Sequence, residues 1–458
     1  MDETASAILS RQRDYFATGA TFPYAHRLQA LQSLRQAILR READILEALR
    51  EDLGKSPAEG YMTEVGMVLE ELSFTIKHLK GWMRPQRVRT PLTHFPASSR
   101  IFPEPVGTVL ILSPWNYPFQ LTVAPLVGAI AAGCTAVVKP SAYAPATAVL
   151  IQELLDGCFA CGYVRTVTGG RQENADLLRL PFDYIFFTGG VTVGKLVLEA
   201  AARHCIPVTL ELGGKSPCIV DRTANIPLAA KRICFGKFLN AGQTCVAPDY
   251  VLAEESIREE LMAAIKACIR DFYGAEPLAC RDYPHIVNRR HFDRLTGLLE
   301  GQPVYCGGGA DPSSLRISPT LLDRPSPDAP VMQEEIFGPI LPVLSFQELS
   351  EAEAFVRARP KPLALYLFSE DKAIQTHVTQ RLSFGGGCIN DTVLHLATPY
   401  MGFGGVGASG MGQYHGKRSF DTFTHYKSVL CQSGRIDLPV RYPPYTVEKD
   451  RLIRRLLK

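Results

Sequence analysis

The stretch Val106-Gly107-Thr108-Val109-Leu110-Ile111-Leu112 is a short apolar run that begins a regular alternation of strand-like and helical segments. Strands of a parallel sheet read as continuous apolar runs of this kind, because helices cover both faces of the sheet. The segments that follow are Leu121–Ala132, Thr135–Val138, Ala144–Leu155, Tyr184–Phe187, Lys195–Ala202 and Val208–Glu211. Their order predicts a doubly wound parallel sheet that binds ligands at the carboxyl ends of its strands.

A second alternating set follows Gly213. Its members are the strand Pro217–Val220, the helix Ile226–Leu239, the strand Tyr250–Ala253 and the helix Ile257–Phe272. The predicted fold class is therefore α/β, with two doubly wound parallel-sheet domains. Upstream of both sets, apolar residues at helical spacing across residues 26–53 predict one amphipathic scaffold helix. Residues 88–102 are short, interrupted by proline and β-like, which predicts a small β excursion.

Composition excludes several classes of protein. The 458 residues carry a net charge of only +3 and no dense basic run, so a nucleic-acid partner is not expected. The start lacks a secretory signal pattern, and the twelve irregularly spaced cysteines are typical of reduced thiols, which predicts a cytoplasmic protein. The basic amphipathic end, residues 451–458, is too short for a stable membrane helix, so membrane contact is not expected.

A candidate nucleophile lies in the stretch Leu239-Asn240-Ala241-Gly242-Gln243-Thr244-Cys245-Val246-Ala247-Pro248. A cysteine thiol titrates near pH 8.5 and needs a base or a positive potential to become a thiolate, and Cys245 alone is equally well a small buried apolar residue. Glu211 raises its significance. This acid ends a β-branched run at the break Leu212-Gly213-Gly214, where a general base is readily presented.

Two glycine-rich tracts compete as phosphate-binding loops. The letters of Gly402–Gly407 fit the dinucleotide fingerprint, but this tract follows Thr398-Pro399-Tyr400 rather than a buried strand, so we reject it. The tract Gly189–Lys195 follows a strand and opens a helix, which makes an anion cradle. A nucleotide phosphotransferase is disfavoured because Leu196 occupies the position where Ser or Thr would hold magnesium.

These motifs together resemble one known family. The stretches around Cys245 and Glu211, with Pro114-Trp115-Asn116-Tyr117-Pro118 and Glu334-Glu335-Ile336-Phe337-Gly338-Pro339, resemble the aldehyde dehydrogenase superfamily from about residue 10 to Pro444. The tail Tyr414-His415-Gly416-Lys417, followed by Phe420-Asp421-Thr422-Phe423, resembles its class 3 branch for fatty and aromatic aldehydes.

The resemblance implies a role for each matching residue. Cys245 would add to the aldehyde carbonyl, Asn116 would stabilise the oxyanion, and Glu211 would activate water, with Glu335 as a second base or a ribose ligand. The implied cofactor is NAD or NADP, and no metal is implied. The implied cofactor-binding residues are Ser113, Trp115, Lys139, Ser141, Gly189, Gly190, Gly194, Leu212, Glu335 and Phe337.

The stretch Lys139-Pro140-Ser141-Ala142 bears on the choice between the two cofactors. By resemblance, Lys139 reaches the hydroxyls of the adenosine ribose, and many NAD-preferring relatives carry an acid where this chain has Ala142. Without that carboxylate the ribose 2′-oxygen loses an acceptor and a repulsive charge, so NADP is expected to be accepted. Gly190 replaces the more usual Ser or Asn and removes one phosphate contact.

The resemblance also implies domains and partners. Residues 1–82 and 106–211 would bind the dinucleotide, residues 212–418 would carry the catalytic cysteine, and residues 83–105 and 419–458 would form a small β oligomerisation arm of a homodimer. The implied substrates are medium-chain, long-chain or aromatic aldehydes, for which Met67, Tyr117 and Leu239 would supply an apolar wall.

Two alternatives to free-acid production stay open. A CoA-acylating aldehyde dehydrogenase is disfavoured because enzymes of that kind lack the glutamate that Glu211 supplies. A catalytically silent dinucleotide-binding or structural protein is disfavoured by the presence of Cys245, Asn116 and Glu211 together.

Overall fold

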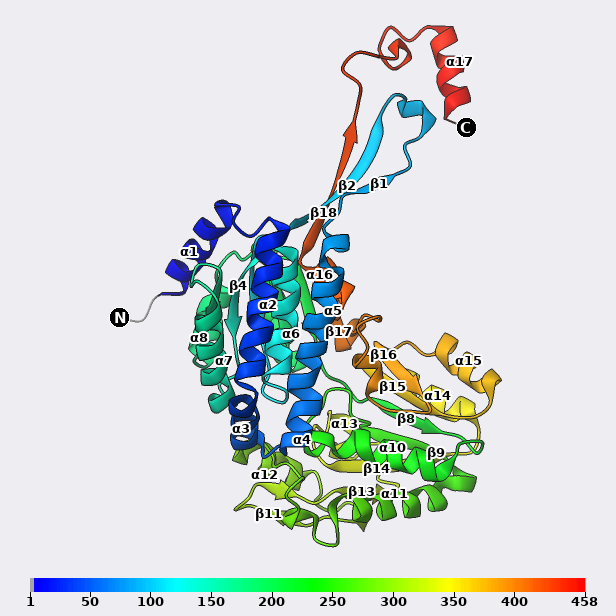
Figure 1. Ribbon diagram of the computed structural model, residues 1–458. Helices are drawn as coiled ribbons and strands as arrows, with labels where there is room; N and C mark the ends of the chain where they lie inside the picture. Colours follow the sequence, from blue (N-terminus) through cyan, green and yellow to red (C-terminus); the bar gives the residue numbers. More distant parts are fainter. Residues whose placement is uncertain (1–3, 458) are drawn as a thin grey trace.

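The molecule consists of two α/β domains, each built on one mainly parallel sheet, and a projecting arm (Figure 1). The computed structural model describes residues 4–457, so Lys458 of the basic end lies outside the described residues. A six-stranded and a seven-stranded sheet, both mainly parallel, confirm the predicted fold class. A three-stranded antiparallel sheet forms the arm.

The first sheet has the strand order β17-β7-β6-β3-β4-β5. Its strands are β3 (Thr108–Leu112), β4 (Thr135–Lys139), β5 (Val164–Thr166), β6 (Tyr184–Thr188), β7 (Val208–Glu211) and β17 (Gly410–Met411). From β3 the chain adds β4 and β5 on one side and β6 and β7 on the other, so the topological switch point lies between β3 and β6. Ligands bind in the crevice beyond such a point. Residues 410–411 fall in the range predicted for the second domain, so the chain returns to the first sheet before residue 418.

Helices cover both faces of this sheet. The long helices α2 and α5 lie beside α6 on one side, and α16 packs against α6 as well (Figure 1). The predicted single helix over residues 26–53 is wrong, because the chain breaks at Arg41 into two helices. The helices of this region are α1 (Ala5–Ala17), α2 (Tyr24–Arg40), α3 (Glu42–Leu53), α4 (Pro57–Gly60), α5 (Gly66–Trp82), α6 (Gln120–Ala132), α7 (Pro145–Cys158), α8 (Arg171–Leu178), α9 (Val191–Ala202) and α16 (Lys417–Thr422).

The second sheet has the order β10-β13-β14-β9-β8-β15-β16, and all its neighbours are parallel except the edge pair β10 and β13. Its strands are β8 (Pro217–Val220), β9 (Tyr250–Glu254), β10 (Val304–Cys306), β13 (Thr320–Asp323), β14 (Ile340–Phe346), β15 (Ala364–Phe368) and β16 (Gly386–Ile389). Its helices are α10 (Ile226–Phe238), α11 (Arg258–Tyr273), α12 (Arg289–Gly297), α13 (Pro330–Gln333), α14 (Leu349–Arg357) and α15 (Lys372–Arg381), and the small pair β11 (Ala310–Asp311) and β12 (Arg316–Ile317) lies beside it.

The arm joins two segments that are far apart in the sequence. Strand β2 (Ser98–Pro105) pairs with β1 (Gln86–Val88) on one side and with β18 (Thr424–Cys431) on the other. Figure 1 shows this ribbon projecting from the body, with α17 (Val447–Leu456) at its far end. The side chain of Leu92, in the loop between β1 and β2, is 88% exposed, and Phe95 beside it is 59% exposed.

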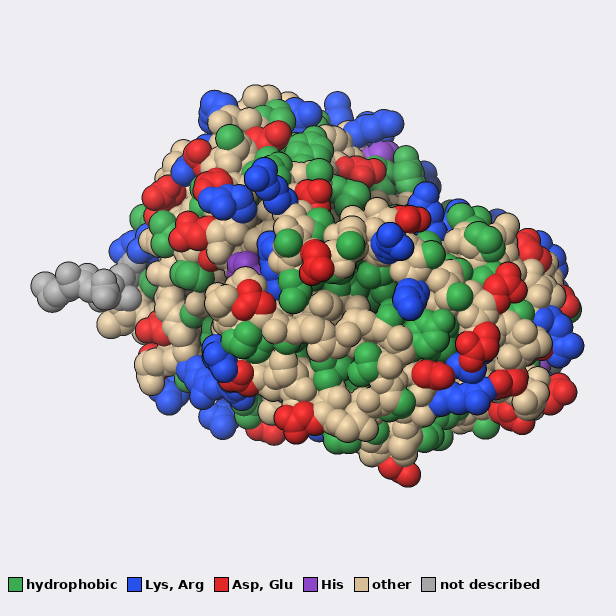
Figure 2. Space-filling view, turned by 90° about the horizontal axis from the view of Figure 1, so that it is seen from below, with side chains coloured by type: hydrophobic (Ala, Val, Ile, Leu, Met, Phe, Trp, Pro, Cys, Tyr) green, Lys and Arg blue, Asp and Glu red, His purple; other side chains and the backbone are tan. Residues whose placement is uncertain are grey.

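Charges of both signs are distributed over the surface. On the face seen in Figure 2, blue and red side chains are interspersed, and green side chains gather toward the centre. No helix between residues 4 and 457 combines the length and the apolar composition that crossing a bilayer requires.

Candidate active site

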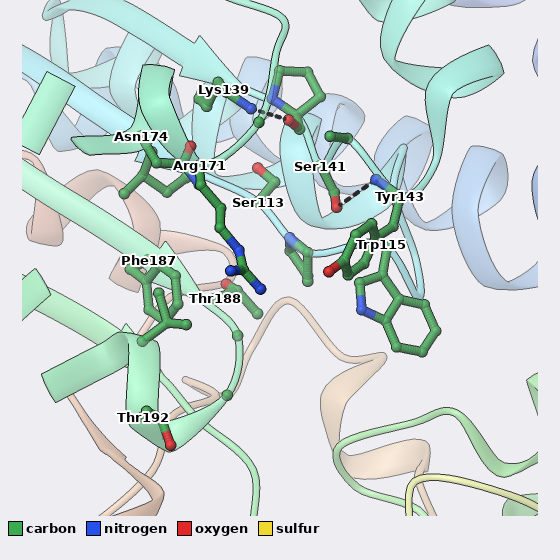
Figure 3. Close-up of a pocket in the computed structure, with 18 of the residues that line it drawn as sticks. Ser113, Trp115, Lys139, Ser141, Tyr143, Arg171, Asn174, Phe187, Thr188 and Thr192 are labelled. Carbon is green, nitrogen blue, oxygen red and sulfur yellow. Dashed lines mark hydrogen bonds between the residues drawn. The ribbon is translucent and has the colours of Figure 1, made fainter. Parts of the chain in front are cut away.

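A cavity of about 850 Å³ near the switch point opens at the carboxyl ends of β3, β4 and β6 (Figure 3). Ser113, Trp115, Lys139 and Ser141 line it, as do the glycines that open α9. Four basic side chains also line it, whereas among the described residues none of those lining it is Asp or Glu. Such a cavity fits an anionic ligand such as a pyrophosphate.

Backbone geometry explains the glycines between β6 and α9. The Gly189 N–H donates to the Glu211 carbonyl at 3.0 Å, which ties this turn to the end of β7. A Cβ on Gly189 would lie 2.5 Å from the Phe187 ring, and one on Gly194 would lie 2.5 Å from the Leu212 side chain. The turn therefore requires glycine for close packing.

Lys139 is the last residue of β4 rather than the first residue after it. Its buried ammonium donates to the carbonyls of Pro140 at 2.9 Å and Gly169 at 2.7 Å, and burial lowers its pKa. Ser141 accepts a hydrogen bond from the Tyr143 N–H at 3.2 Å. These contacts fix a basic and a hydroxyl group at the adjoining ends of β4 and β5.

On the opposite rim, Trp115 forms an edge-to-face contact with Phe337, with the ring centroids 5.3 Å apart. His291 of α12 lies against the same indole ring, with the centroids 5.1 Å apart. Phe337 itself has a left-handed backbone, with φ of 49°. His291 thus brings one aromatic ring of the second domain to the lining of the cavity, whereas Phe337 contacts Trp115 from outside that lining.

Cys245 follows a tight turn at the end of α10. Asn240 and Ala241 adopt left-handed backbone angles, with φ of 52° and 50°, which is unusual for residues other than glycine. The Gln243 side chain holds the turn, since its amide donates to the Asn240 carbonyl at 3.1 Å. The turn leaves the Cys245 side chain half-buried.

The Cys245 side chain opens into a second cavity of about 260 Å³, whose lining is mostly apolar. All three residues expected to form an apolar wall, Met67, Tyr117 and Leu239, line it. Phe403, from the rejected glycine tract, lines it too and pairs through its backbone with Tyr414. That tract therefore forms a wall of the cysteine's cavity and lies outside the lining of the larger one.

Asn116 lies against the turn that carries Cys245. Its side-chain amide donates to the Gln243 carbonyl at 3.0 Å, and its own carbonyl accepts from the Asn240 side chain at 2.7 Å. The Asn116 carbonyl also accepts from the Lys55 ammonium at 3.1 Å. These bonds hold the predicted oxyanion donor in direct contact with the turn, at the carbonyl of Gln243 two residues before the cysteine.

The ion pair that supports this contact has no signature in the sequence. Lys55 and Glu64 lie 2.5 Å apart, and both side chains are fully buried. Glu64 also accepts from the backbone N–H groups of Phe119 at 2.8 Å and Gln120 at 3.2 Å. Glu64 belongs to a five-residue π-helical segment, Tyr61–Val65, which has no sequence signature but is frequent at functional sites.

Glu211 ends β7 with its carboxyl group deeply buried. Its side chain is 3% exposed, and within residues 4–457 neither carboxyl oxygen has a hydrogen-bond partner. Burial raises the pKa of Glu211 well above its usual range. Burial also raises the pKa of Glu335 to about 8, against an opposing contribution from the Gly214 N–H.

The Cys245 thiol is strongly disfavoured as a thiolate in this environment. Burial raises its pKa to about 12, and the carboxyl groups of Glu335 and Glu211 raise it further in that order. Both carboxyl groups are therefore within electrostatic reach of the Cys245 thiol. A carboxylate close to a thiol is also a base that can accept its proton.

A second basic side chain likewise has no signature in the sequence. Lys237, on α10, is fully buried, and its ammonium has no hydrogen-bond partner in the described part of the chain. Burial lowers its pKa to about 8, while Asp249 and Glu335 oppose that shift.

Among residues 4–457, no group of three or more His, Cys, Asp and Glu side chains could hold a metal ion.

Comparison with known proteins agrees with this geometry. A family model described as the aldehyde dehydrogenase family matches residues 2–429. The chain belongs to the aldehyde dehydrogenase family. It is 53% identical to 4,4′-diaponeurosporen-aldehyde dehydrogenase of Staphylococcus aureus, over 94% of each chain. It is 44% identical to the dimeric NADP-preferring aldehyde dehydrogenase of Rattus norvegicus, over 97% of this chain and 99% of that protein.

A solved structure of an aldehyde dehydrogenase, the substrate-bound AldH of Staphylococcus aureus, superimposes with a TM-score of 0.98 over 100% of both chains at 50% identity. Family, relatives and structure agree over nearly the whole length. The chain is therefore an aldehyde dehydrogenase that oxidises aldehydes with NAD or NADP.

The buried Lys55–Glu64 pair yields a first prediction. Glu64→Gln keeps the shape of the side chain but leaves the Lys55 ammonium buried without a counter-charge. We expect the free energy of unfolding to fall by about 3–5 kcal/mol, measured as a lower midpoint of denaturant unfolding. The control Glu70→Gln lies on the exposed side of the neighbouring helix and should change it by less than about 0.5 kcal/mol. Equal midpoints for the two variants would contradict the prediction.

Proposed function

We propose that Cys245 is the nucleophile of the aldehyde oxidation, and that it forms a thiohemiacetal and then a thioester. The observation that carries this proposal is the position of its thiol, which lines an apolar cavity and lies within electrostatic reach of two buried carboxyl groups. An aldehyde cannot lose hydride readily until addition makes a tetrahedral adduct, so a nucleophile at this point is required.

The larger cavity is the proposed cofactor site. Its volume of about 850 Å³, its basic lining and its position at the start of α9 fit a dinucleotide whose pyrophosphate lies at the helix N-terminus. Lys139 and Ser141 would hold the adenosine ribose, while Trp115 and Phe337 would flank the other half. Bound NAD(P) would supply the hydride acceptor and a positively charged ring.

Two groups would stabilise the oxyanion of the adduct. The Asn116 amide has two N–H bonds, of which one donates to the Gln243 carbonyl, so the second is available for the substrate oxygen. The backbone N–H of Cys245 is the other proposed donor. Loss of one such donor typically lowers the rate by about 10²–10³.

Glu211 is the proposed base for the later steps. Its raised pKa makes its ionised form a stronger base than an ordinary carboxylate, and its partner-free oxygens can accept a proton from the thiol or from water. Glu335 could also act as a base. The alternative role for Glu335 is to bind the ribose of the cofactor. Water attack would then release a free carboxylic acid.

Two variants separate these steps. Cys245→Ala should lose essentially all activity, because no thiol remains to add to the carbonyl. Glu211→Gln should still release one equivalent of reduced cofactor in a burst, and then lower the steady-state rate by about 10²–10⁴ because general-base catalysis is lost. Reduced cofactor is followed by absorbance, and the thioester on Cys245 by intact-protein mass spectrometry.

The matched control for the thiol is Cys205→Ala, which removes an exposed cysteine after α9 and should leave the rate unchanged. Wild-type turnover by Cys245→Ala would contradict the proposed nucleophile. A product that appears only as acyl-CoA would instead favour the CoA-acylating alternative.

The proposed substrates are medium-chain, long-chain or aromatic aldehydes. The cavity beside Cys245 is enclosed by Met67, Phe235, Leu239 and Val393, which offer hydrophobic surface to an acyl tail. Charged aldehydes would lose hydration there without gaining a partner. One relative named above is a 4,4′-diaponeurosporen-aldehyde dehydrogenase.

This lining makes the dependence on chain length measurable. Along a series of linear aldehydes, kcat/KM should rise about fourfold for each added methylene, because burying one methylene contributes about 0.8 kcal/mol. The rise should stop when the cavity is filled. Phe235→Asp should flatten the series, whereas Leu228→Asp, an exposed site on the same helix, should not. A wild-type kcat/KM that does not change with chain length would contradict the proposal of an apolar substrate.

We further propose a homodimer that uses the β arm. The arm projects from the body with Leu92 and Phe95 exposed at its loop, and one relative is named as dimeric. All twelve cysteines carry free thiols, which supports the proposed location in the reducing cytoplasm.

Sedimentation velocity should give twice the chain mass of 50.4 kDa. Leu92→Glu combined with Phe95→Glu should shift the protein toward the monomer, because two charges would be buried in the interface. Val149→Glu introduces the same charge at an exposed apolar site on α7 and should leave the mass unchanged. A monomeric wild type would refute the dimer.

A further inference from the structure

The charge balance of the cofactor cavity is one-sided. Lys139, Arg171, Arg290 and Arg294 line it, while the described residues supply no Asp or Glu to its lining. Arg294 is already bound, because it donates to Glu334 at 2.8 Å and to the Ile336 carbonyl at 2.6 Å. The Lys139 ammonium donates two hydrogen bonds to backbone carbonyl groups. The Arg171 guanidinium, by contrast, has no ion pair or hydrogen bond among the described residues.

The strand order fixes which end of a dinucleotide lies near Arg171. Glu211 ends β7, and the next strands toward Lys139 are β6, β3 and β4. Three strand spacings of about 4.8 Å place the two residues about 14 Å apart across the sheet. Because the aldehyde reacts beside Glu211, the nicotinamide must lie toward β7. The adenosine must then lie toward the ends of β4 and β5.

Arg171 lies at that end. It is the first residue of α8 and directly follows Gly169 and Gly170, and Gly169 also supplies the carbonyl that holds Lys139. Figure 3 shows its side chain extending from the edge of the cavity toward the middle. In the described part of the chain its guanidinium has neither an ion pair nor a hydrogen-bond acceptor. Five N–H donors in a cavity without acids thus have no protein partner.

We infer that Arg171 binds the 2′-phosphate of NADP and determines how well this chain uses the phosphorylated cofactor. The assignment rests on the proposed cofactor site. A 2′-phosphate carries about −1.5 to −2 charges near neutral pH, and a planar guanidinium binds such a group through two parallel hydrogen bonds. Ala142 on the facing loop brings no carboxylate that would repel it.

The nearby charges leave this site attractive to a phosphate. Glu173 lies in the first turn of α8, but its own backbone N–H and the Gly170 N–H, which donates at 2.6 Å, stabilise its carboxylate and lower its pKa, and Lys139 adds a smaller effect. The N-terminus of the eight-residue α8 adds a positive end of a helix dipole. Arg290 belongs to α12 of the second domain, next to His291 against Trp115, and therefore lies on the opposite rim.

Mononucleotide binding tests the assignment without turnover. Isothermal titration of the full chain with 2′,5′-ADP and with 5′-AMP measures the contribution of the 2′-phosphate directly. Arg171→Ala should weaken 2′,5′-ADP binding by about 10- to 100-fold, the effect of losing a charge-assisted bidentate contact. Its affinity for 5′-AMP should be unchanged. Arg171→Lys should recover part of the loss, because the charge remains but the planar fork is lost.

Kinetics with both cofactors supplies the second readout. Arg171→Ala should raise the KM for NADP by the same factor and leave kcat/KM for NAD unchanged. Arg179→Ala removes a positive charge from the end of the same helix, outside the cavity, and serves as the control. Equal losses for both mononucleotides would show adenine stacking instead and overturn the assignment, as would a wild type that binds them equally. A wild-type protein without activity with either cofactor would refute the proposed function. The mononucleotide titration would still show whether Arg171 binds the 2′-phosphate.

Discussion

The buried ion pair between Lys55 and Glu64 is the contact on which the proposed active site depends. Glu64 fixes the backbone at Phe119, and Lys55 fixes the carbonyl of Asn116, so one pair holds both ends of the loop that carries the proposed oxyanion donor. Charges without access to water are stable only when every partner is in place. The loop is therefore held in one position, against the turn of Cys245, before any ligand arrives.

Electrostatics divides the site into two regions of opposite character. The cavity proposed for the cofactor presents basic groups and no acids among its described lining, which suits an anionic dinucleotide. The cysteine lies beside Glu211 and Glu335, which are buried and whose pKa values are raised. Burying a carboxyl group without a hydrogen-bond partner lowers stability. Such groups nevertheless occur at functional sites, because the raised pKa gives proton transfer a stronger base.

Several features of the site could be predicted from local sequence. Cys245, Glu211 and the glycines before α9 each interrupt an apolar strand or a helix with a residue whose chemistry stands out. Lys55 and Lys237 could not be found in this way, because a lysine in a sequence is ordinarily an exposed charge. Only the packing of distant segments makes both of them buried. The break at Arg41 was missed for a related reason, since the apolar period continues across it while Arg41 bonds Glu153 of α7.

Local sequence is enough to predict the two α/β domains, the succession of strands and helices along the chain and the residues proposed for catalysis, because periodicity and turn residues act locally. Only the packing of distant segments brings the charged side chains together. It brought Lys55 to Asn116, Arg171 to the end of the cofactor cavity and β17 back into the first sheet. These outcomes depend on contacts between segments tens to hundreds of residues apart. The burial that those contacts create also sets the pKa of each ionisable group.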